Sequence, residues 1–471
     1  MAELGVTGFV VLLLALAFEP GSVFSLSRSE QEAVYAVLEG VNSAVSWRSL
    51  FPDDLCSSAP HGVVCDFFTD SATSGAAVPH VIELSFGYVS DYSPNPPCGP
   101  NPNFDPLLLL PLTHLKKLFF FRCFTESEFP FPDFSPLSSP PPLEELVFIE
   151  NPSLVGTMEG RIGKLQNLRR LIVTGSEVSG SILTTSNSFD VLSNLEQLTL
   201  SRNKIKGEIA EAAFESLRKL KILDLSYNEF QGTLPDSIGK SGELLKLDLS
   251  YNGFSGRIPE ALKGIKNLEF LDLSYNNFTN DGVPLFLSEM SNLREVYLSG
   301  NLLGGEIPEI WGALGGVRGV GLSGVGLVGN IPRSMGLHLG GLCYLGLDNN
   351  MLEGEVPEEF GGLSLLNELN LENNNLSGRL PFSAGFVAKL GGRLKMEGNL
   401  GICIDEGLRS AKVSGGLKVC RQPDLPKTAL FHENSCSCPW QVGVRFWDSR
   451  GKNIHLESAE PFWSEGNSSM T

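Results

Sequence analysis

One short motif recurs along most of this chain. The six residues Leu-Asp-Leu-Ser-Tyr-Asn occur three times, opening at Leu223, Leu247 and Leu271, so these copies are 24 residues apart. Looser copies, mostly 24 or 25 residues apart, open at Leu118, Leu146, Leu171, Leu198, Val296, Val320, Leu345, Leu369 and, truncated, Leu394. Eleven full repeats and a stub predict a solenoid, because each repeat can pack on its neighbours without a central core.

Each copy predicts a short strand followed by a turn. Side chains alternate along a strand, so both leucines of Leu-x-Leu face inward and the residue between them faces outward. The position five residues after the opening one is usually asparagine: Asn151, Asn203, Asn228, Asn252, Asn276, Asn301, Asn350, Asn374 and Asn399. A buried asparagine there can satisfy backbone groups left unpaired where the strand ends, which predicts an asparagine ladder. Cys123, Ser176 and Val325 replace it in three repeats, the last two as weak rungs.

The second half of each repeat contains Gly and Pro, as in Gly256-Arg257-Ile258-Pro259, and therefore cannot be helical throughout. We expect it to form the outer wall of the solenoid. The predicted fold class is an α/β solenoid with a parallel, concave sheet and disulfide-linked caps.

Composition excludes some functions and indicates export. The chain has 35 Lys and Arg against 54 Asp and Glu, a net charge of −19, which argues against nucleic-acid binding. Residues 8–18 form an apolar run too short to span a membrane, followed by small residues, so we interpret residues 1–25 as a signal peptide. No apolar run near 18 residues occurs elsewhere, so no membrane span is expected.

The spacing of the nine cysteines suits an oxidising compartment. Cys56 with Cys65 is expected to close an N-terminal cap (residues 26–103, with a helix from Glu30 to Val41), and Cys403 with Cys420 a C-terminal cap (401–425). Cys98 and Cys123 form a plausible third bridge. The alternative is six independent thiols, and spacing assigns no partner to Cys343, Cys436 or Cys438. The repeats occupy residues 104–400, and residues 426–471 form an irregular tail.

Three Asn-x-Ser/Thr sequences are candidate N-glycosylation sites: Asn277, Asn375 and Asn467. The first two directly follow a ladder asparagine. Unused sites are the alternative.

No catalytic or metal-binding pattern is convincing, and we expect no cofactor and no enzyme activity. Gly319, Gly321 and Gly324 match a nucleotide-binding spacing, but the strand-to-helix context is missing. A zinc site from His432, Cys436, Cys438 and His455 would have an unusual spacing. No Ser/His/Asp set, kinase signature or P-loop is present.

The concave face of the predicted sheet is the candidate recognition surface. It should change from apolar to acidic along the chain, with these candidate ligand-binding residues: Phe119, Phe121, Ile149, Asp224, Tyr227, Asp248, Tyr251, Asp272, Tyr275, Gly321, Tyr344 and Asp348. The aspartate rows should repel one another and favour a cationic partner, and Gly321 should leave a flat patch. Alternatively, the Asp and Tyr rows are only repeat consensus, and the Phe pair packs under the proline-rich segment 129–142.

The pattern Leu-Ser-x-Asn-x-Leu-Ser-Gly-x-Ile-Pro resembles the plant leucine-rich repeat class over residues 118–400. Residues 30–35, 61–65, 84–87 and 115–123 resemble the receptor-like group that contains Too Many Mouths and Piriformospora indica-insensitive protein 2, and residues 146–156 and 282–287 are most like Receptor-like protein 29. The resemblance implies a kinase-less ectodomain, secreted or at the cell surface, that binds a peptide or protein ligand or a partner receptor kinase.

Two other function classes are compatible with this pattern. One is a soluble apoplastic inhibitor of cell-wall hydrolases, similar to polygalacturonase-inhibiting proteins. The other is a carbohydrate-active enzyme, for which the stacked aspartates are the only candidate acid and base.

Overall fold

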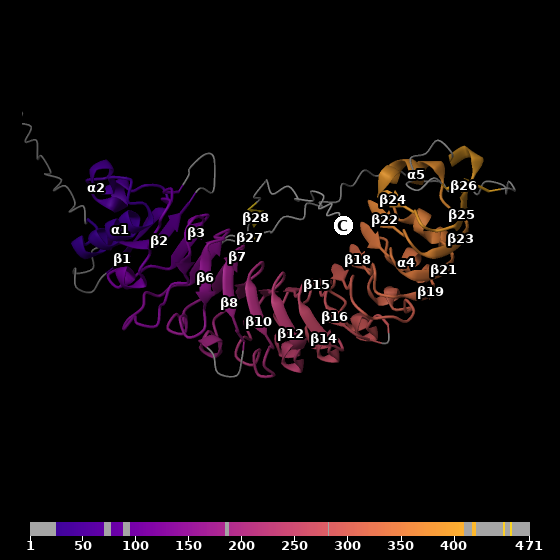
Figure 1. The fold of residues 1–471 in the computed structure, drawn as a ribbon, viewed down its shortest axis with the longest axis horizontal. Coiled ribbons are helices and arrows are strands. Elements are labelled where there is room, and N and C mark those ends of the chain that lie inside the picture. Colours follow the sequence, from indigo (N-terminus) through magenta and orange to yellow (C-terminus); the bar gives the residue numbers. More distant parts are fainter. Residues whose placement is uncertain are drawn as a thin grey trace, which may run out of the picture.

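The computed structural model describes residues 25–69, 77–87, 95–183, 188–280, 282–408 and 417–420, and the backbone of residues 446–447 and 453–454. The chain forms a curved solenoid, with the N-terminal cap and the C-terminal cap at opposite ends of an open arc (Figure 1). The predicted fold class is confirmed.

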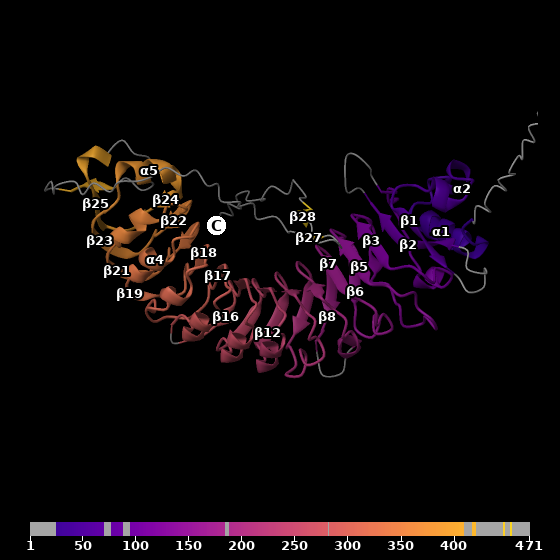
Figure 2. The same cartoon turned by 180° about the vertical axis from the view of Figure 1, so that it is seen from behind.

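A 14-stranded sheet follows the inner side of the arc, and the view from behind shows the same arrangement (Figure 2). Its strands, in spatial order, are β1 (Val63–Thr69), β2 (Ala77–Phe86), β3 (Lys117–Phe121), β5 (Glu145–Ile149), β7 (Arg170–Thr174), β9 (Gln197–Thr199), β11 (Ile222–Asp224), β13 (Lys246–Asp248), β15 (Phe270–Asp272), β17 (Glu295–Tyr297), β18 (Gly319–Gly321), β20 (Tyr344–Gly346), β22 (Glu368–Asn370) and β24 (Leu394–Lys395). Only β1 and β2 pair antiparallel; all later neighbours are parallel.

Two smaller parallel sheets flank the large one. The first contains β4 (Phe129–Pro130), β6 (Leu154–Thr157), β8 (Glu177–Gly180), β10 (Lys204–Gly207), β12 (Glu229–Thr233), β14 (Gly253–Gly256) and β16 (Asn277–Phe278). The second contains β19 (Val328–Asn330), β21 (Met351–Glu355), β23 (Asn375–Arg379), β25 (Gly401–Ile404) and β26 (Lys418–Val419). Sequence analysis predicted an outer wall here but not that part of it is sheet.

Short helical turns complete the outer wall, as expected where Gly and Pro interrupt the chain. They are η2 (Pro106–Leu109), η3 (Ser188–Val191), η4 (Asp236–Lys240), η5 (Glu260–Gly264), η6 (Leu285–Glu289), η7 (Trp311–Ala313), α4 (Arg333–His338), η8 (Glu358–Gly362), α5 (Ala384–Leu390), η9 (Gly391–Arg393) and η10 (Glu406–Leu408). A separate pair of strands, β27 (Phe446–Trp447) and β28 (Asn453–Ile454), lies in the C-terminal region.

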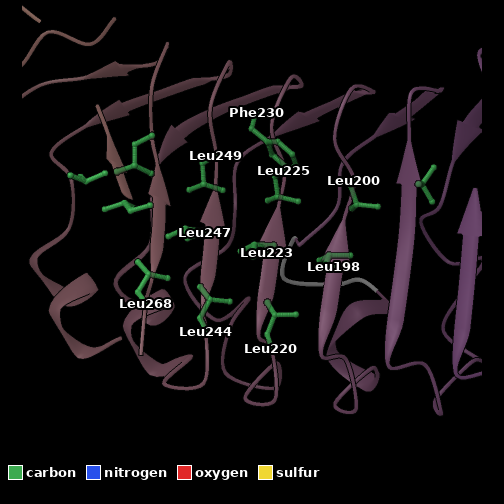
Figure 3. Packing of buried hydrophobic residues seen from close by; sticks show 14 of the residues in the cluster. Leu198, Leu200, Leu220, Leu223, Leu225, Phe230, Leu244, Leu247, Leu249 and Leu268 are labelled. Carbon is green, nitrogen blue, oxygen red and sulfur yellow. The ribbon is translucent and has the colours of Figure 1, made fainter. Parts of the chain in front are cut away.

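The core is a continuous row of leucines shared between coils. Leu223, Leu247 and Leu271 pair in register on adjacent strands, and all three are fully buried. Figure 3 shows these rows side by side, with Leu198, Leu223 and Leu247 in one row and Leu200, Leu225 and Leu249 in the next. Burial of shared apolar side chains therefore replaces a central core.

The asparagine ladder forms as predicted. The Asn252 side-chain amide donates to the carbonyls of Leu225, Leu249 and Ser250 at 2.9, 3.2 and 3.1 Å, and its oxygen accepts from the Phe230 amide at 3.1 Å. One side chain thus links three successive coils. At the weak rung Ser176, the buried hydroxyl has no hydrogen-bond partner among the described residues.

The N-terminal cap is built on α1 (Arg28–Val41), α2 (Trp47–Leu50) and α3 (Leu55–Ser58). The helix predicted for residues 30–41 is α1, and Ser27 caps it by accepting from the Glu30 amide at 3.2 Å. The cap also contributes β2, which pairs parallel with β3 through Leu84 and Leu118. Sequence analysis missed β2 as a sheet strand because its distance along the chain from β3 exceeds the repeat length.

All three predicted disulfides are present. Cys56–Cys65 and Cys98–Cys123 hold the N-terminal cap, with Cα–Cα distances of 5.5 and 5.1 Å, and Cys403–Cys420 holds the C-terminal end at 5.0 Å. Cys98–Cys123 joins the cap to the turn after β3, which fixes the cap on the first repeat.

Several predictions lie outside the described residues: the signal peptide up to residue 24, Asn467, and His432, Cys436, Cys438 and His455 of the zinc alternative. Within the described part of the chain, no helix has the length and apolarity needed to cross a bilayer. The same part contains no cluster of three or more potential metal ligands.

Candidate recognition surface

Four columns of side chains run along the concave side of the solenoid. Relative to the opening residue of each repeat, they lie one residue before it and one, three and four residues after it. The first three columns alternate with the buried leucines, because successive side chains of a strand point to opposite faces of the sheet. The fourth column follows the strand, and its non-glycine members adopt positive φ, for example Tyr227 at 54° and Asn373 at 54°.

An apolar patch occupies the N-terminal end of this surface. It consists of Phe119, Phe121, Val147, Ile149 and Ile172, which form a cluster separate from the leucine core. The strand register explains it, because Phe119 pairs with Val147 and Phe121 with Ile149 on the next strand. Ile149 is buried in the floor of the patch, whereas the two phenylalanines are half-buried.

The proline-rich segment does not explain the patch. Its residues Phe131 and Phe134 are fully buried in the leucine core, and the Phe131 ring packs on Phe148, which points inward. The alternative that Phe119 and Phe121 pack under this segment is therefore wrong, because the segment contributes to the opposite side of the sheet.

Cations lie over both phenylalanine rings. The Lys117 ammonium is 5.8 Å from the centre of the Phe119 ring, and the Arg122 guanidinium is 5.2 Å from that of Phe121. Attraction between a cation and a ring face is modest at exposed sites, on the order of 0.5–1 kcal/mol. The apolar patch is thus bordered by positive charge.

The aspartate rows in the middle of the surface carry their own counter-ion. The Lys246 ammonium lies 2.8 Å from Asp224 Oδ2 and 3.3 Å from Asp248 Oδ2, and the pair Ser226 and Ser250 each donate a 2.7 Å hydrogen bond to these carboxylates. Burial would lower the pKa of Lys246, but the two carboxylates outweigh burial and raise it. Asp224 and Asp248 are thus neutralised within the chain, which corrects the expectation that both need a cationic ligand.

Asp272 is in a different position. The place between Asp248 and Asp272 that corresponds to Lys246 is occupied by Phe270, which cannot neutralise a carboxylate. Burial and the neighbouring charge of Asp248 raise the pKa of Asp272 to about 7. Sequence analysis treated the three aspartates as equivalent.

We expect Asp272→Asn to remove a pH dependence of folding stability. Between the unfolded pKa near 3.8 and the folded pKa of about 7, the folded protein binds a proton that the unfolded chain lacks, so stability falls as pH rises through this window. The loss amounts to up to about 4 kcal/mol, at about 1.4 kcal/mol per pKa unit. Urea denaturation of both proteins between pH 4 and pH 8 measures it. The exposed Asp236→Asn is the control and should keep the wild-type slope; an unchanged slope in Asp272→Asn would refute the assignment.

Three tyrosines form a stack in the fourth column. The ring centres of Tyr227 and Tyr251 are 4.1 Å apart, and those of Tyr251 and Tyr275 are 4.3 Å apart. The Arg202 guanidinium lies 5.5 Å from the Tyr227 ring centre and closes that end of the stack. These rings therefore line the edge of the concave surface rather than its middle, where the sequence motif had placed them.

Gly321 does not provide the predicted flat patch. It is buried, and a Cβ there would lie 2.8 Å from Cδ1 of Tyr297, so the tyrosine ring occupies the space above it. The Tyr297 ring in turn lies 6.3 Å from that of Tyr344. Burial and the nearby carboxylates of Glu368 and Asp348 raise the pKa of Tyr344 to about 12.

The C-terminal end of the surface is acidic. Asp348, Glu372 and Glu397 follow one another in the third column, and Lys395 pairs with Glu368 at 2.8 Å. Asp348 accepts hydrogen bonds from Ser323 Oγ and Asn349 Nδ2, both at 2.5 Å, which fix its position. The predicted change from apolar to acidic along the face is therefore present.

Leucine-rich repeat models match residues 166–230, 265–284, 243–265, 292–314 and 365–386. The chain belongs to the leucine-rich repeat proteins. Two curated relatives from Arabidopsis thaliana are Protein Too Many Mouths, 35% identical over 141 residues, and Receptor like protein 29, 34% identical over 154 residues. These alignments cover 30% and 32% of this chain but only 26% and 30% of the relatives. The similarity to plant receptor-like proteins is thus confirmed over part of each chain.

A solved structure of similar shape is the plant peptide hormone receptor RGFR1 in complex with RGF2. It is 28% identical, has a TM-score of 0.54, and the comparison covers 68% of this chain and 50% of the receptor.

Sequence analysis of this leucine-rich repeat protein missed two residues of the surface. Lys246 precedes an opening leucine whose repeat and preceding repeat both carry aspartate, and that combination was the available signal. Tyr297 replaces aspartate in the next repeat, directly before the glycine that its ring covers. The candidates Asp224, Asp248 and Gly321 are structural, whereas Phe119, Phe121, Tyr275, Tyr344 and Asp348 remain accessible or half-buried on the surface.

Proposed function

We propose that this protein is an exported, kinase-less recognition module at the cell surface that binds an extended peptide or a segment of a partner protein along its concave face. It works with a partner receptor kinase, since it carries no kinase signature of its own. The similarity to receptor-like proteins and to a peptide hormone receptor supports this proposal.

The observation that carries the proposal is the apolar patch. Phe119 and Phe121 are only half-buried, on the side of the sheet that faces away from the leucine core. Aromatic anchors of this kind contribute much of the binding energy when a partner buries them. Stability of the solenoid does not require them, because the leucines of the same strands already form the core.

Charge and length define the ligand further. Ten strand spacings separate β3 from β22, about 48 Å, which an extended peptide of about 14 residues would span. Such a peptide would place an aromatic or aliphatic side chain on the apolar patch and basic side chains over Asp272, Asp348 and Glu372. Complementary charge would also speed association and make it sensitive to salt.

Panning a displayed library of random 16-residue peptides against the purified full-length protein tests this function. We expect enrichment of peptides with net positive charge and at least one aromatic or aliphatic residue. The double variant Phe119→Ala/Phe121→Ala should reduce retention of the enriched peptides at least tenfold, because tenfold corresponds to about 1.4 kcal/mol, typical of an anchor residue. Leu337→Ala, 64% exposed on α4 in the outer wall, is the matched control and should retain them fully.

Two results would contradict the proposal. One is equal retention of peptides by the double variant, with wild-type stability confirmed by thermal unfolding. The other is strong inhibition of pectin hydrolases by the purified protein, which would favour the inhibitor class instead.

A further inference from the structure

The turn after β15 places an aromatic ring next to a candidate glycosylation site. Asn276 points inward as a ladder residue, whereas Tyr275, Asn277 and Thr279 are all exposed. Tyr275 and Asn277 therefore leave the coil on either side of a buried residue, at the same edge of the solenoid. Tyr275 holds a φ of 54°, which turns the chain sharply at this point.

One face of the Tyr275 ring has no side chain in front of it. The other face packs on Tyr251 at 4.3 Å. On the open side lies Gly300, where a Cβ would come within 2.7 Å of the ring, followed by Gly324, where a Cβ would meet nothing within 4 Å. The ring is 49% exposed. At the opposite end of the stack, Arg202 fills the corresponding place beside Tyr227.

We propose that Asn277 carries an N-linked glycan and that its first N-acetylglucosamine packs on the open face of Tyr275. The proposal rests on the export included in the proposed function. In the transfer, Asn277 Nδ2 bonds to the anomeric carbon of the sugar, the bond to the lipid diphosphate of the oligosaccharide donor breaks, and the amide loses one proton. Thr279, two residues later, completes the acceptor sequence and is accessible.

A sugar ring fits this position for a physical reason. A pyranose presents C–H groups on one face, and an exposed aromatic ring is the apolar surface that such a face can cover without losing hydrogen bonds to water. The ring is also held in place by the stack, so little side-chain entropy is lost on contact.

A second site in the same protein serves as an internal comparison. Asn375 has the same place in its repeat and is also exposed, with Ser377 completing its sequence. Two residues before it stands Asn373, also at a φ of 54°, whose amide donates to Asn349 Oδ1 at 2.9 Å. Asn375 therefore has the same backbone geometry without an aromatic platform.

The test is secretion of the full-length protein from eukaryotic cells as wild type, Tyr275→Ala and Tyr227→Ala. Glycopeptide mass spectrometry measures the occupancy of Asn277 and Asn375. We expect Tyr275→Ala to lower occupancy at Asn277 at least twofold and to leave Asn375 unchanged, while Tyr227→Ala changes neither. Enzymatic removal of the sugars should lower the unfolding temperature of the wild type by about 1–2 °C more than that of Tyr275→Ala.

Each other outcome overturns a defined part of the argument. An occupied Asn375 with a bare Asn277 overturns the proposed site. Equal occupancy of Asn277 in wild type and Tyr275→Ala, with equal shifts on sugar removal, overturns the contact with the ring. Two bare sites in secreted protein overturn glycosylation, and failure to enter the secretory pathway overturns the export of the proposed function.

Discussion

Replacing Lys246 with methionine should lower the free energy of unfolding by about 2–4 kcal/mol. The substitution keeps the aliphatic stem but leaves the buried carboxylates Asp224 and Asp248 without a cation. Breaking a fully buried pair costs about 3–5 kcal/mol, and the value here is smaller because about one-third of the lysine side chain is exposed. Urea denaturation at pH 7 measures the effect.

Acidification gives a second signature of the same variant. As pH falls, both carboxylates bind protons and no longer need Lys246, so the difference between variant and wild type should narrow toward pH 4. Lys221→Met is the matched control, because Lys221 pairs with Glu196 at 2.9 Å on the exposed edge, where such pairs contribute little. Equal losses in the two variants would show that the aspartate rows do not depend on Lys246.

Replacing Leu247 with alanine should cost about 2–5 kcal/mol, the usual range for a fully buried leucine in a rigid core. Leu247 pairs in register with Leu223 and Leu271, so the cavity would open between three coils at once. Because each repeat is stabilised through its neighbours, we expect protease sensitivity to increase first in the coils around residue 247.

Leu245→Ala is the control for this second variant. Leu245 is only two residues away but is 40% exposed at the edge of the sheet, so its truncation should change stability by less than about 1 kcal/mol. A loss as large as that of Leu247→Ala would mean that the coil derives its stability from the edge rather than from the inward leucines.

Lys246 and Leu247 show how far a repeated sequence can be interpreted. The inward side of the strand follows from alternation alone, so the fate of Leu247 was predictable from the spacing of leucines. The outward side depends on which residues of neighbouring coils come into register, and these are about 24 positions apart in the chain. The pairing of Lys246 with two aspartates is therefore a property of stacking.

The same distinction applies to the apolar patch and to Gly321. Phe119 and Phe121 depart from the repeat consensus, which marked them as candidates, but only the register with Val147 and Ile149 shows that they form one cluster. Gly321 appeared open because glycine has no side chain. Tyr297 of the preceding coil covers it, and no local pattern indicates where that ring turns.

The sequence by itself determined the solenoid, the inward leucines, the asparagine ladder and the three disulfides. These features repeat with a fixed period or involve residues whose pairing follows from chain order, so local spacing is sufficient to specify them. The tertiary structure decided which charges on the concave face are neutralised, which ring faces stay open and which glycines are covered. Those properties arise between coils, where side chains far apart in the sequence meet at strand-to-strand distances.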